Sequence, residues 1–232
     1  YSTLCIWKSR IMIKKILFGS KDKMKSAYLW NTCAAMLNAF QTVFILMLIS
    51  RIDPVIDAGV FTIAFAIGNL MMAIGKYGIR QFQVSDVEEK YSFKEYTVAR
   101  IITSIIMIAA SFVYVGVNLA SGLYDSSKSI VIILICLAKV IDAVEDVIHG
   151  MFQQYLRLDV AGKILSIRMC TYIFVYLVCY YFSKNLILTS AVALLVSFIQ
   201  FVILNYTAIR GFEIKKKTFE IKNVKNIFVE CF

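Results

Sequence analysis

Proline and charge are scarce in this sequence. Pro54 is the single proline, and charged residues make up only 17% of the 232 residues, whereas hydrophobic residues make up 60%. Soluble domains carry roughly 25% charged residues. The composition therefore excludes an ordinary soluble domain and indicates a protein whose solvent is the lipid bilayer.

The cysteines lack any metal-binding pattern. The chain has six cysteines and one histidine, but it has no C-x-x-C pair and no cysteine-histidine spacing that suits a zinc site. We interpret the cysteines as small apolar residues. We expect no metal site and no cofactor.

The basic charge balance has a membrane explanation. A net charge of +10 is by itself compatible with nucleic-acid binding. The Lys and Arg residues, however, lie mainly beside hydrophobic segments, where such residues usually face the cytoplasm and anionic lipid headgroups. We therefore expect membrane lipid as a partner, and no nucleic acid.

Six apolar segments approach the ~20 residues that a helix needs to cross a bilayer. They predict an all-α integral membrane protein with a six-transmembrane-helix bundle over residues 29–209. A basic cytoplasmic tail, 1–28, precedes this bundle, and a basic amphipathic cytoplasmic segment, 210–232, follows it. The six segments are 29–50, 56–79, 101–121, 129–149, 164–183 and 186–209.

The basic residues are distributed unevenly between the two sides of the predicted bundle. Nineteen of the 25 Lys and Arg residues lie in the two terminal segments and in the longer connections, 80–100 and 150–163. Only Arg51, Lys128 and Lys184 lie in the short connections on the other side. Because cytoplasmic loops carry an excess of Lys and Arg, both termini are predicted to be cytoplasmic.

Polar residues gather on one face of each of the first two segments. At 100° per residue, those of the first segment fall within about 80°, and those of the second, which include Thr62, fall within about 60°. A membrane helix turns such a face toward protein or water. The candidates for a substrate cavity are Asn31, Asn38, Gln41, Asn69, Lys76, Arg80 and Gln83.

The fourth segment carries a charged stripe. Lys139, Asp142, Glu145, Asp146 and His149 lie on an arc of about 120°. Each ionised residue near the bilayer centre costs roughly 2.5 to 3.5 kcal/mol, so the stripe must face other helices or water, with Lys139 and Asp142 spaced to neutralise one another. Two interpretations stay open: buried pairs that hold the bundle together, and a hydrophilic cavity.

Two amphipathic segments lie outside the predicted spans. Residues 81–96 mix charged and aromatic side chains, which is typical either of a short segment at the cytoplasmic surface or of a connecting helix. Residues 215–232 place apolar side chains among lysines, which predicts an interfacial helix.

Several stretches resemble the oligosaccharide and polysaccharide flippases of the multidrug/oligosaccharidyl-lipid/polysaccharide exporter superfamily. They are RIDPVIDAG from Arg51 to Gly59, the following VFTIAFAIGNLMMAIGKYGIR, then QFQVSD, and GMFQQYLRLDVAGKILSIR from Gly150 to Arg168. Members of that family usually have twelve or more helices in two six-helix lobes. The resemblance therefore implies one lobe, the N-terminal one, which needs a C-terminal lobe or a second copy.

The resemblance implies a function as well. Such a transporter moves an isoprenoid-linked oligosaccharide to the outer leaflet of the bacterial plasma membrane for surface polysaccharide biosynthesis. Lys76 and Arg80 are then candidates to meet the diphosphate of this lipid-linked saccharide. The candidates for ion coupling, by a cation or a proton, are Lys139, Asp142, Glu145, Asp146 and His149.

Other functions are compatible with part of this pattern. A drug or cation exporter of the same superfamily is the nearest alternative. An integral-membrane transferase is a weaker one, because the acidic residues of the stripe match no metal-dependent transferase motif. A six-helix permease of the ATP-binding cassette type is another weak alternative, since the chain has no P-loop. We expect no catalytic residues and no enzyme activity.

Overall fold

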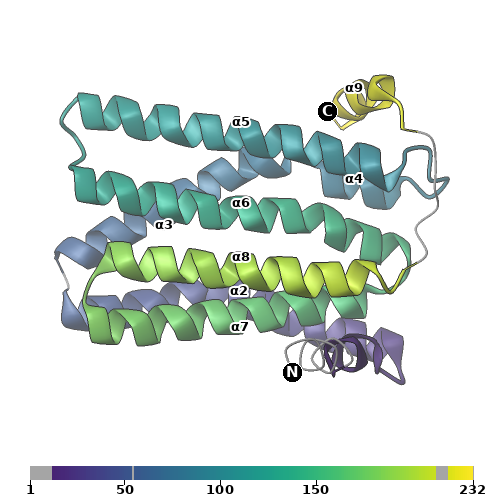
Figure 1. The fold of residues 1–232 in the computed structure, drawn as a ribbon, viewed down its shortest axis with the longest axis horizontal. Helices are drawn as coiled ribbons and strands as arrows, with labels where there is room; N and C mark the ends of the chain where they lie inside the picture. The colour runs from purple at the N-terminus through teal and green to yellow at the C-terminus, as the bar shows by residue number, and fades with distance from the viewer. Residues whose placement is uncertain (1–11, 54, 213–218, 232) are drawn as a thin grey trace, which may run out of the picture.

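The computed structural model describes residues 12–53, 55–212 and 219–231. In these ranges the chain is all-helical, which confirms the all-α part of the predicted fold class (Figure 1). Residues 12–18 are helical. The helices that follow are α2 Lys23–Ile52, α3 Ile56–Lys76, α4 Ile79–Ser85, α5 Phe93–Ala120, α6 Ser126–Gln154, α7 Leu158–Ser183, α8 Leu186–Ile209 and α9 Ile221–Glu230.

Five helical stretches are long and apolar enough to cross a membrane, by length and composition. They are α2, the α3–α4 stretch Ile56–Ser85, α5, α7 and α8, and they identify a multi-pass membrane protein. Helix α6 is not one of the five, because ionisable residues crowd its second half from Lys139 to Asp146. The predicted count of six spans therefore depends on how α6 is placed.

Helix α6 lies in the middle of the bundle. It packs against α3, α4, α5, α7 and α8, while α2 packs mainly on α7 (Figure 1). Residues 12–18, α4 and α9 lie at one end of the bundle, which we call the terminal end. The short connections that follow α2, α5 and α7 lie at the opposite end, which we call the loop end.

The two longer connections predicted over 80–100 and 150–163 are largely helical. Helix α5 begins at Phe93 because Ser92 and Glu95 form a capping box, in which the Ser92 N–H donates to Glu95 Oε2 at 2.6 Å. An apolar segment predicts only the part of a helix that lies in lipid. Polar residues with adequate helix propensity can extend the same helix beyond that part. Arg100 therefore lies within a helix and not in a loop.

The second predicted span is not one continuous helix. Tyr77 and Gly78 adopt left-handed backbone conformations, with φ of 39° and 68°, and end α3 before α4 begins. Glycine adopts this conformation without steric cost, which explains why the chain turns here. Arg80 and Gln83 consequently lie on the separate short helix α4, which packs against α6.

The segment 81–96 divides at Asp86. Helix α4 ends before it, and a turn leads to the cap of α5. One Asp86 carboxylate oxygen accepts from the Lys90 N–H at 2.8 Å, and the other accepts from the Tyr96 hydroxyl at 2.9 Å. The connection is thus a fixed turn between two helices.

A helix, α9, lies where the sequence predicts an interfacial helix near the C-terminus, although residues 213–218 and 232 lie outside the described residues. Its position at the membrane surface stays a prediction. Val224 and Ile227 are buried against the bundle, whereas Ile221 is exposed. The Asn223 amide donates to Glu95 Oε1 at 2.8 Å. Helix α9 therefore packs on the start of α5 at the terminal end.

The predicted N-terminal tail is partly structured. Residues 1–11 lie outside the described residues, and α2 begins at Lys23, within the predicted tail. The Lys163 ammonium of α7 donates to the Ile16 and Leu17 carbonyls at 2.9 and 3.0 Å. This contact holds helical residues 12–18 against the bundle.

Candidate functional site

The charged stripe of α6 faces the bundle interior. Lys139, Glu145, Asp146 and His149 are buried, and the Asp142 side chain is only 14% exposed. The partners of these residues come from α4, α5, α7 and α8, as described below. The stripe therefore avoids the cost of placing charge against lipid.

Asp146 joins α6 to α4 and α5. One carboxylate oxygen pairs with Arg80 at 3.3 Å, and the other pairs with Arg100 at 2.9 Å. Arg100 is fully buried, and it also donates to the Gly75 carbonyl near the end of α3. Thr103 donates to the same carbonyl at 2.7 Å. This arrangement fixes the end of α3 just before the turn at Tyr77.

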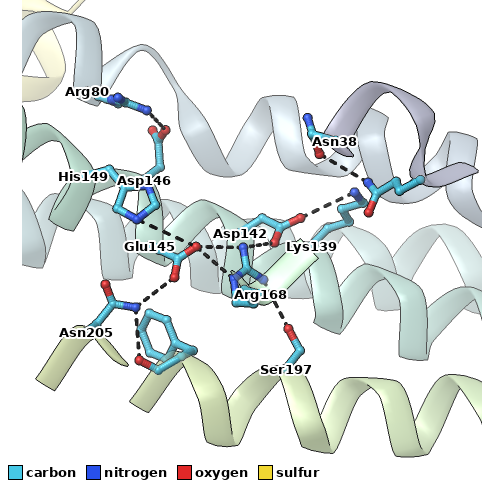
Figure 2. Close-up of polar contacts among 12 residues, drawn as sticks. Asn38, Arg80, Lys139, Asp142, Glu145, Asp146, His149, Arg168, Ser197 and Asn205 are labelled. Atoms are coloured by element: carbon cyan, nitrogen blue, oxygen red, sulfur yellow. Dashed lines mark hydrogen bonds and ion pairs between the residues drawn. The ribbon is translucent and has the colours of Figure 1, made fainter. Parts of the chain in front are cut away.

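Arg168 of α7 bridges two carboxylates of the stripe (Figure 2). Its guanidinium lies 2.6 Å from Asp142 and 2.7 Å from Glu145, and it donates to the Ser197 hydroxyl of α8 at 3.2 Å. Lys139 pairs with Asp142 at 3.4 Å, as the i, i+3 spacing predicts. Three helices are thus joined by one buried ionic cluster.

Glu145 has a second set of neighbours at the terminal end. The Asn205 amide of α8 donates to Glu145 Oε1 at 2.8 Å, and His149 Nε2 lies 4.0 Å from Glu145 Oε2 (Figure 2). Both His149 Nε2 and Asn205 Oδ1 are buried without a hydrogen-bond partner among the described residues. Such orphaned atoms are rare in native interiors.

Cations outnumber carboxylates around α6. The carboxylates are Asp142, Glu145 and Asp146, while the cations are Lys76, Arg80, Arg100, Lys139 and Arg168. Two positive charges therefore have no counter-charge of their own, with His149 neutral. This surplus makes the site complementary to an anion.

The excess positive charge is accessible to solvent at Lys76 and Arg80. The Arg80 side chain is 29% exposed, whereas those of Arg100, Lys139 and Arg168 are 0%, 6% and 2% exposed. Lys76 is half-buried, and its positive charge favours the ionised form of Asp142. It makes no ion pair with another described residue. These two residues form the open side of the cluster.

The remaining cavity candidates are dispersed. Asn31 donates to the Leu158 carbonyl at 3.0 Å and so joins α2 to α7. Gln41 is buried and donates to Asn38, which is exposed. Asn69 is exposed on α3. Among the described residues, none of these four side chains hydrogen-bonds to a charged residue of the cluster.

Gln83 lies beside the cluster without opening onto it. Its side chain is fully buried, and its backbone carbonyl accepts from Gln154 at 2.7 Å. It therefore joins α4 to the end of α6. Lys76 and Arg80 are the charged candidates from the first two segments, and both are partly exposed.

Three partners of the charged stripe were not predicted from the sequence. Arg100 was assigned to a connection, and neither Arg168 nor Asn205 was selected. The one available signal was that Arg168 is the single cation within the apolar segment 164–183. A cation at that depth requires an acidic partner.

Fold and site together define a multi-pass helical membrane protein with a buried ionic cluster. No protein-family model, curated protein or solved structure matches the chain.

Proposed function

We propose that this chain is a six-helix membrane lobe that transports a lipid with an anionic, diphosphate-bearing headgroup. The observation that carries the proposal is the pair of surplus positive charges beside α6, exposed at Lys76 and Arg80. A guanidinium and an ammonium on adjoining helices suit a diphosphate, because Arg binds one phosphate bidentately and Lys supplies a point charge.

Helix α6 is the sixth span in this proposal. Its 29 residues extend about 43 Å at 1.5 Å per residue, which exceeds the ~30 Å of a bilayer core. Its charges face α4, α5, α7 and α8 and not the outside of the bundle. Intramembrane charges occur in this setting, paired within a helical bundle.

The resemblance to polysaccharide flippases supports a more specific substrate. It suggests an isoprenoid-linked oligosaccharide that enters from the cytoplasmic leaflet and leaves from the outer leaflet. The terminal end, with its basic segments, then faces the cytoplasm. A second lobe, or a second copy of the chain, completes the transport path.

The charge surplus also distinguishes this substrate from the alternatives. A drug or cation exporter binds positively charged molecules, which the unbalanced cations repel. A metal-dependent transferase needs carboxylates that are free to bind its metal. Here Asp142, Glu145 and Asp146 each lie within 3 Å of a guanidinium nitrogen.

Transport in reconstituted vesicles tests the proposal. The protein, expressed from its full coding sequence, is placed in vesicles with a fluorescent diphosphate-linked polyprenyl lipid, and delivery to the opposite leaflet is measured. The double variant Lys76→Gln/Arg80→Gln should fold, since its side chains stay polar, but delivery should fall at least about tenfold, the equivalent of one charge-assisted hydrogen bond. Arg80→Lys should retain only part of the activity.

A matched control changes two lysines at the other end of the bundle. Lys128→Gln/Lys184→Gln removes the same number of charges from the loop end and should leave delivery within about twofold of the unaltered protein. Equal delivery by both double variants and the unaltered protein would contradict the proposal. It would leave Lys76 and Arg80 as anchors to membrane phosphates.

A further inference from the structure

His149 is the single histidine of the chain, and its position calls for an explanation. The residue is 4% exposed, and Nε2 has no hydrogen-bond partner among the described residues. Leaving a buried polar atom unpaired costs about 1 to 3 kcal/mol. The nearest acceptor, Glu145 Oε2, is 4.0 Å away, which is beyond hydrogen-bond distance.

The charges around His149 oppose one another. Burial is the largest influence and disfavours a protonated imidazole; Arg80 of α4 and Arg168 of α7 add to this, whereas Glu145 and Asp146 of α6 favour the protonated form. Helix α8 presents the neutral Asn205, and Arg100 of α5 occupies the second oxygen of Asp146. Lys76 of α3 lies further along the stripe, near Asp142.

Arg80 is the variable member of this set. Arg168 is almost completely enclosed and holds two carboxylates, whereas Arg80 is partly exposed and belongs to the proposed anion site. An anion bound to Arg80 offsets its positive charge. The balance around the imidazole then shifts toward Glu145 and Asp146.

We propose that His149 takes up a proton when an anion binds to Lys76 and Arg80. This inference rests on the proposed function and adds a second ligand, the proton, to the same site. The proton comes from water and binds the free imidazole nitrogen, so that both ring nitrogens carry hydrogen. A movement of about 1 Å then lets Nε2 donate to Glu145 Oε2 in a charge-assisted hydrogen bond.

The proposal has a reciprocal consequence. If anion binding promotes proton uptake, then a lower pH must strengthen anion binding by the same coupling. Glu145 is shared between His149 and Arg168, so uptake at His149 also weakens the hold of Arg168 on Glu145. The proton thereby acts on the contact between α6 and α7.

Titration calorimetry of the purified full chain in lipid nanodiscs tests this coupling. The probe is dimethyl diphosphate with one methyl group on each phosphate, because its two charges do not change near neutral pH. Titrations in two buffers with different heats of ionisation give the number of protons taken up per bound anion. We expect uptake that rises toward one proton as the pH is lowered from 7.5 to 5.5.

His149→Gln is the main variant. It should bind the probe within about threefold of the unaltered protein at pH 7.5, but without proton uptake. Lys128→Gln, at the loop end, should leave both quantities unchanged. Probe binding without proton uptake in the unaltered protein, or the same uptake in His149→Gln, overturns the inference and leaves the proposed function standing. Absence of probe binding overturns both.

A second measurement covers the case in which His149→Gln fails to fold. Because the chain has one histidine, ring-15N labelling gives one pair of imidazole nitrogen signals in the unaltered protein. Adding the probe at pH 6 should shift these signals toward those of imidazolium. Signals that stay unchanged at saturating probe overturn the inference.

Discussion

The two ends of the bundle are held together by different chemistry. Toward the terminal end, α6 is joined to its neighbours by charged pairs, as in Asp146 with Arg100 at 2.9 Å. Toward the loop end, tyrosine hydroxyls join α7 to α8 and α3: the Tyr176 hydroxyl lies 2.9 Å from the Ser190 hydroxyl, and Tyr180 donates to Asp57 at 2.7 Å. Both kinds of contact join separate helices.

The difference lies in what the loss of one partner leaves behind. A tyrosine without its hydroxyl leaves a benzene ring that still packs, as Tyr176 does against Phe61 at 5.6 Å between ring centroids. An arginine or carboxylate without its partner leaves a buried charge, which is strongly destabilising. The loop end should therefore tolerate substitution better than the fully buried charged residues of the terminal end.

Arg168→Met should have the largest effect. It removes the cation shared by Asp142 and Glu145 and should lower the free energy of unfolding by about 3 to 5 kcal/mol. Denaturant unfolding of the purified protein in detergent measures this. Arg210→Met, which changes an exposed arginine on Tyr206, should cost less than about 1 kcal/mol. Similar losses in the two variants would show that the cluster does not stabilise the bundle.

Asp146→Asn should have the second-largest effect and lower the free energy of unfolding by about 3 kcal/mol. It leaves Arg100 fully buried without a carboxylate. It also removes the carboxylate partner of Arg80, but Arg80 is partly exposed. A double-mutant cycle with Arg100→Gln sharpens the test, because Arg100→Gln in the Asp146→Asn background should restore part of the loss. Simple addition of the two single losses would refute a direct coupling.

Tyr180→Phe tests the loop end. It removes one hydroxyl and leaves Asp57 half-buried with access to water, so the cost should be about 1 kcal/mol by the same denaturant measurement. Phe61 and Tyr176 should keep their packing. A loss as large as that of Arg168→Met would abolish the contrast between the two ends.

The smallest effect is expected at α9. Hydrogen bonds from Lys90 and Tyr91 lower the pKa of Glu230, and the same contact with Glu230 raises the pKa of Lys90. Because the pKa of Glu230 is depressed in the folded state, its contribution is present at neutral pH and is lost as the pH falls through that value. The distance between spin labels on α9 and α5 should therefore increase on acidification. In Glu230→Gln a smaller increase, relative to the unaltered protein, should already be present at neutral pH.

The sequence predicted the apolar parts of the fold better than its turns. The segment 186–209 coincides with α8, whose two ends are marked by the cap at Asn185 and the loss of apolar residues after Ile209. The break at Tyr77 was not predicted, because the polar spacing continues through it as if the helix were unbroken. The turn is formed by the left-handed backbone at Tyr77 and Gly78, and it lets α4 pack on α6.

The candidate site was predicted on α6 but not around it. The stripe from Lys139 to His149 follows from helical periodicity, which is a local property. Its partners Arg100 and Arg168 come from other helices, and their pairing depends on tertiary packing that periodicity does not contain. Of the two interpretations of the stripe, the structure shows the buried pairs, which leave two cations without a carboxylate of their own. The hydrophilic cavity stays a prediction.

Anion affinity tests the central claim most directly, namely that the surplus charge at Lys76 and Arg80 forms a binding site. Calorimetry of the purified chain with dimethyl diphosphate at pH 7.5 and low salt gives the dissociation constant. We expect measurable binding that weakens at least about tenfold in Lys76→Gln/Arg80→Gln and stays within about twofold in Lys128→Gln/Lys184→Gln. Equal affinity in all three proteins, or no binding at all, would contradict it.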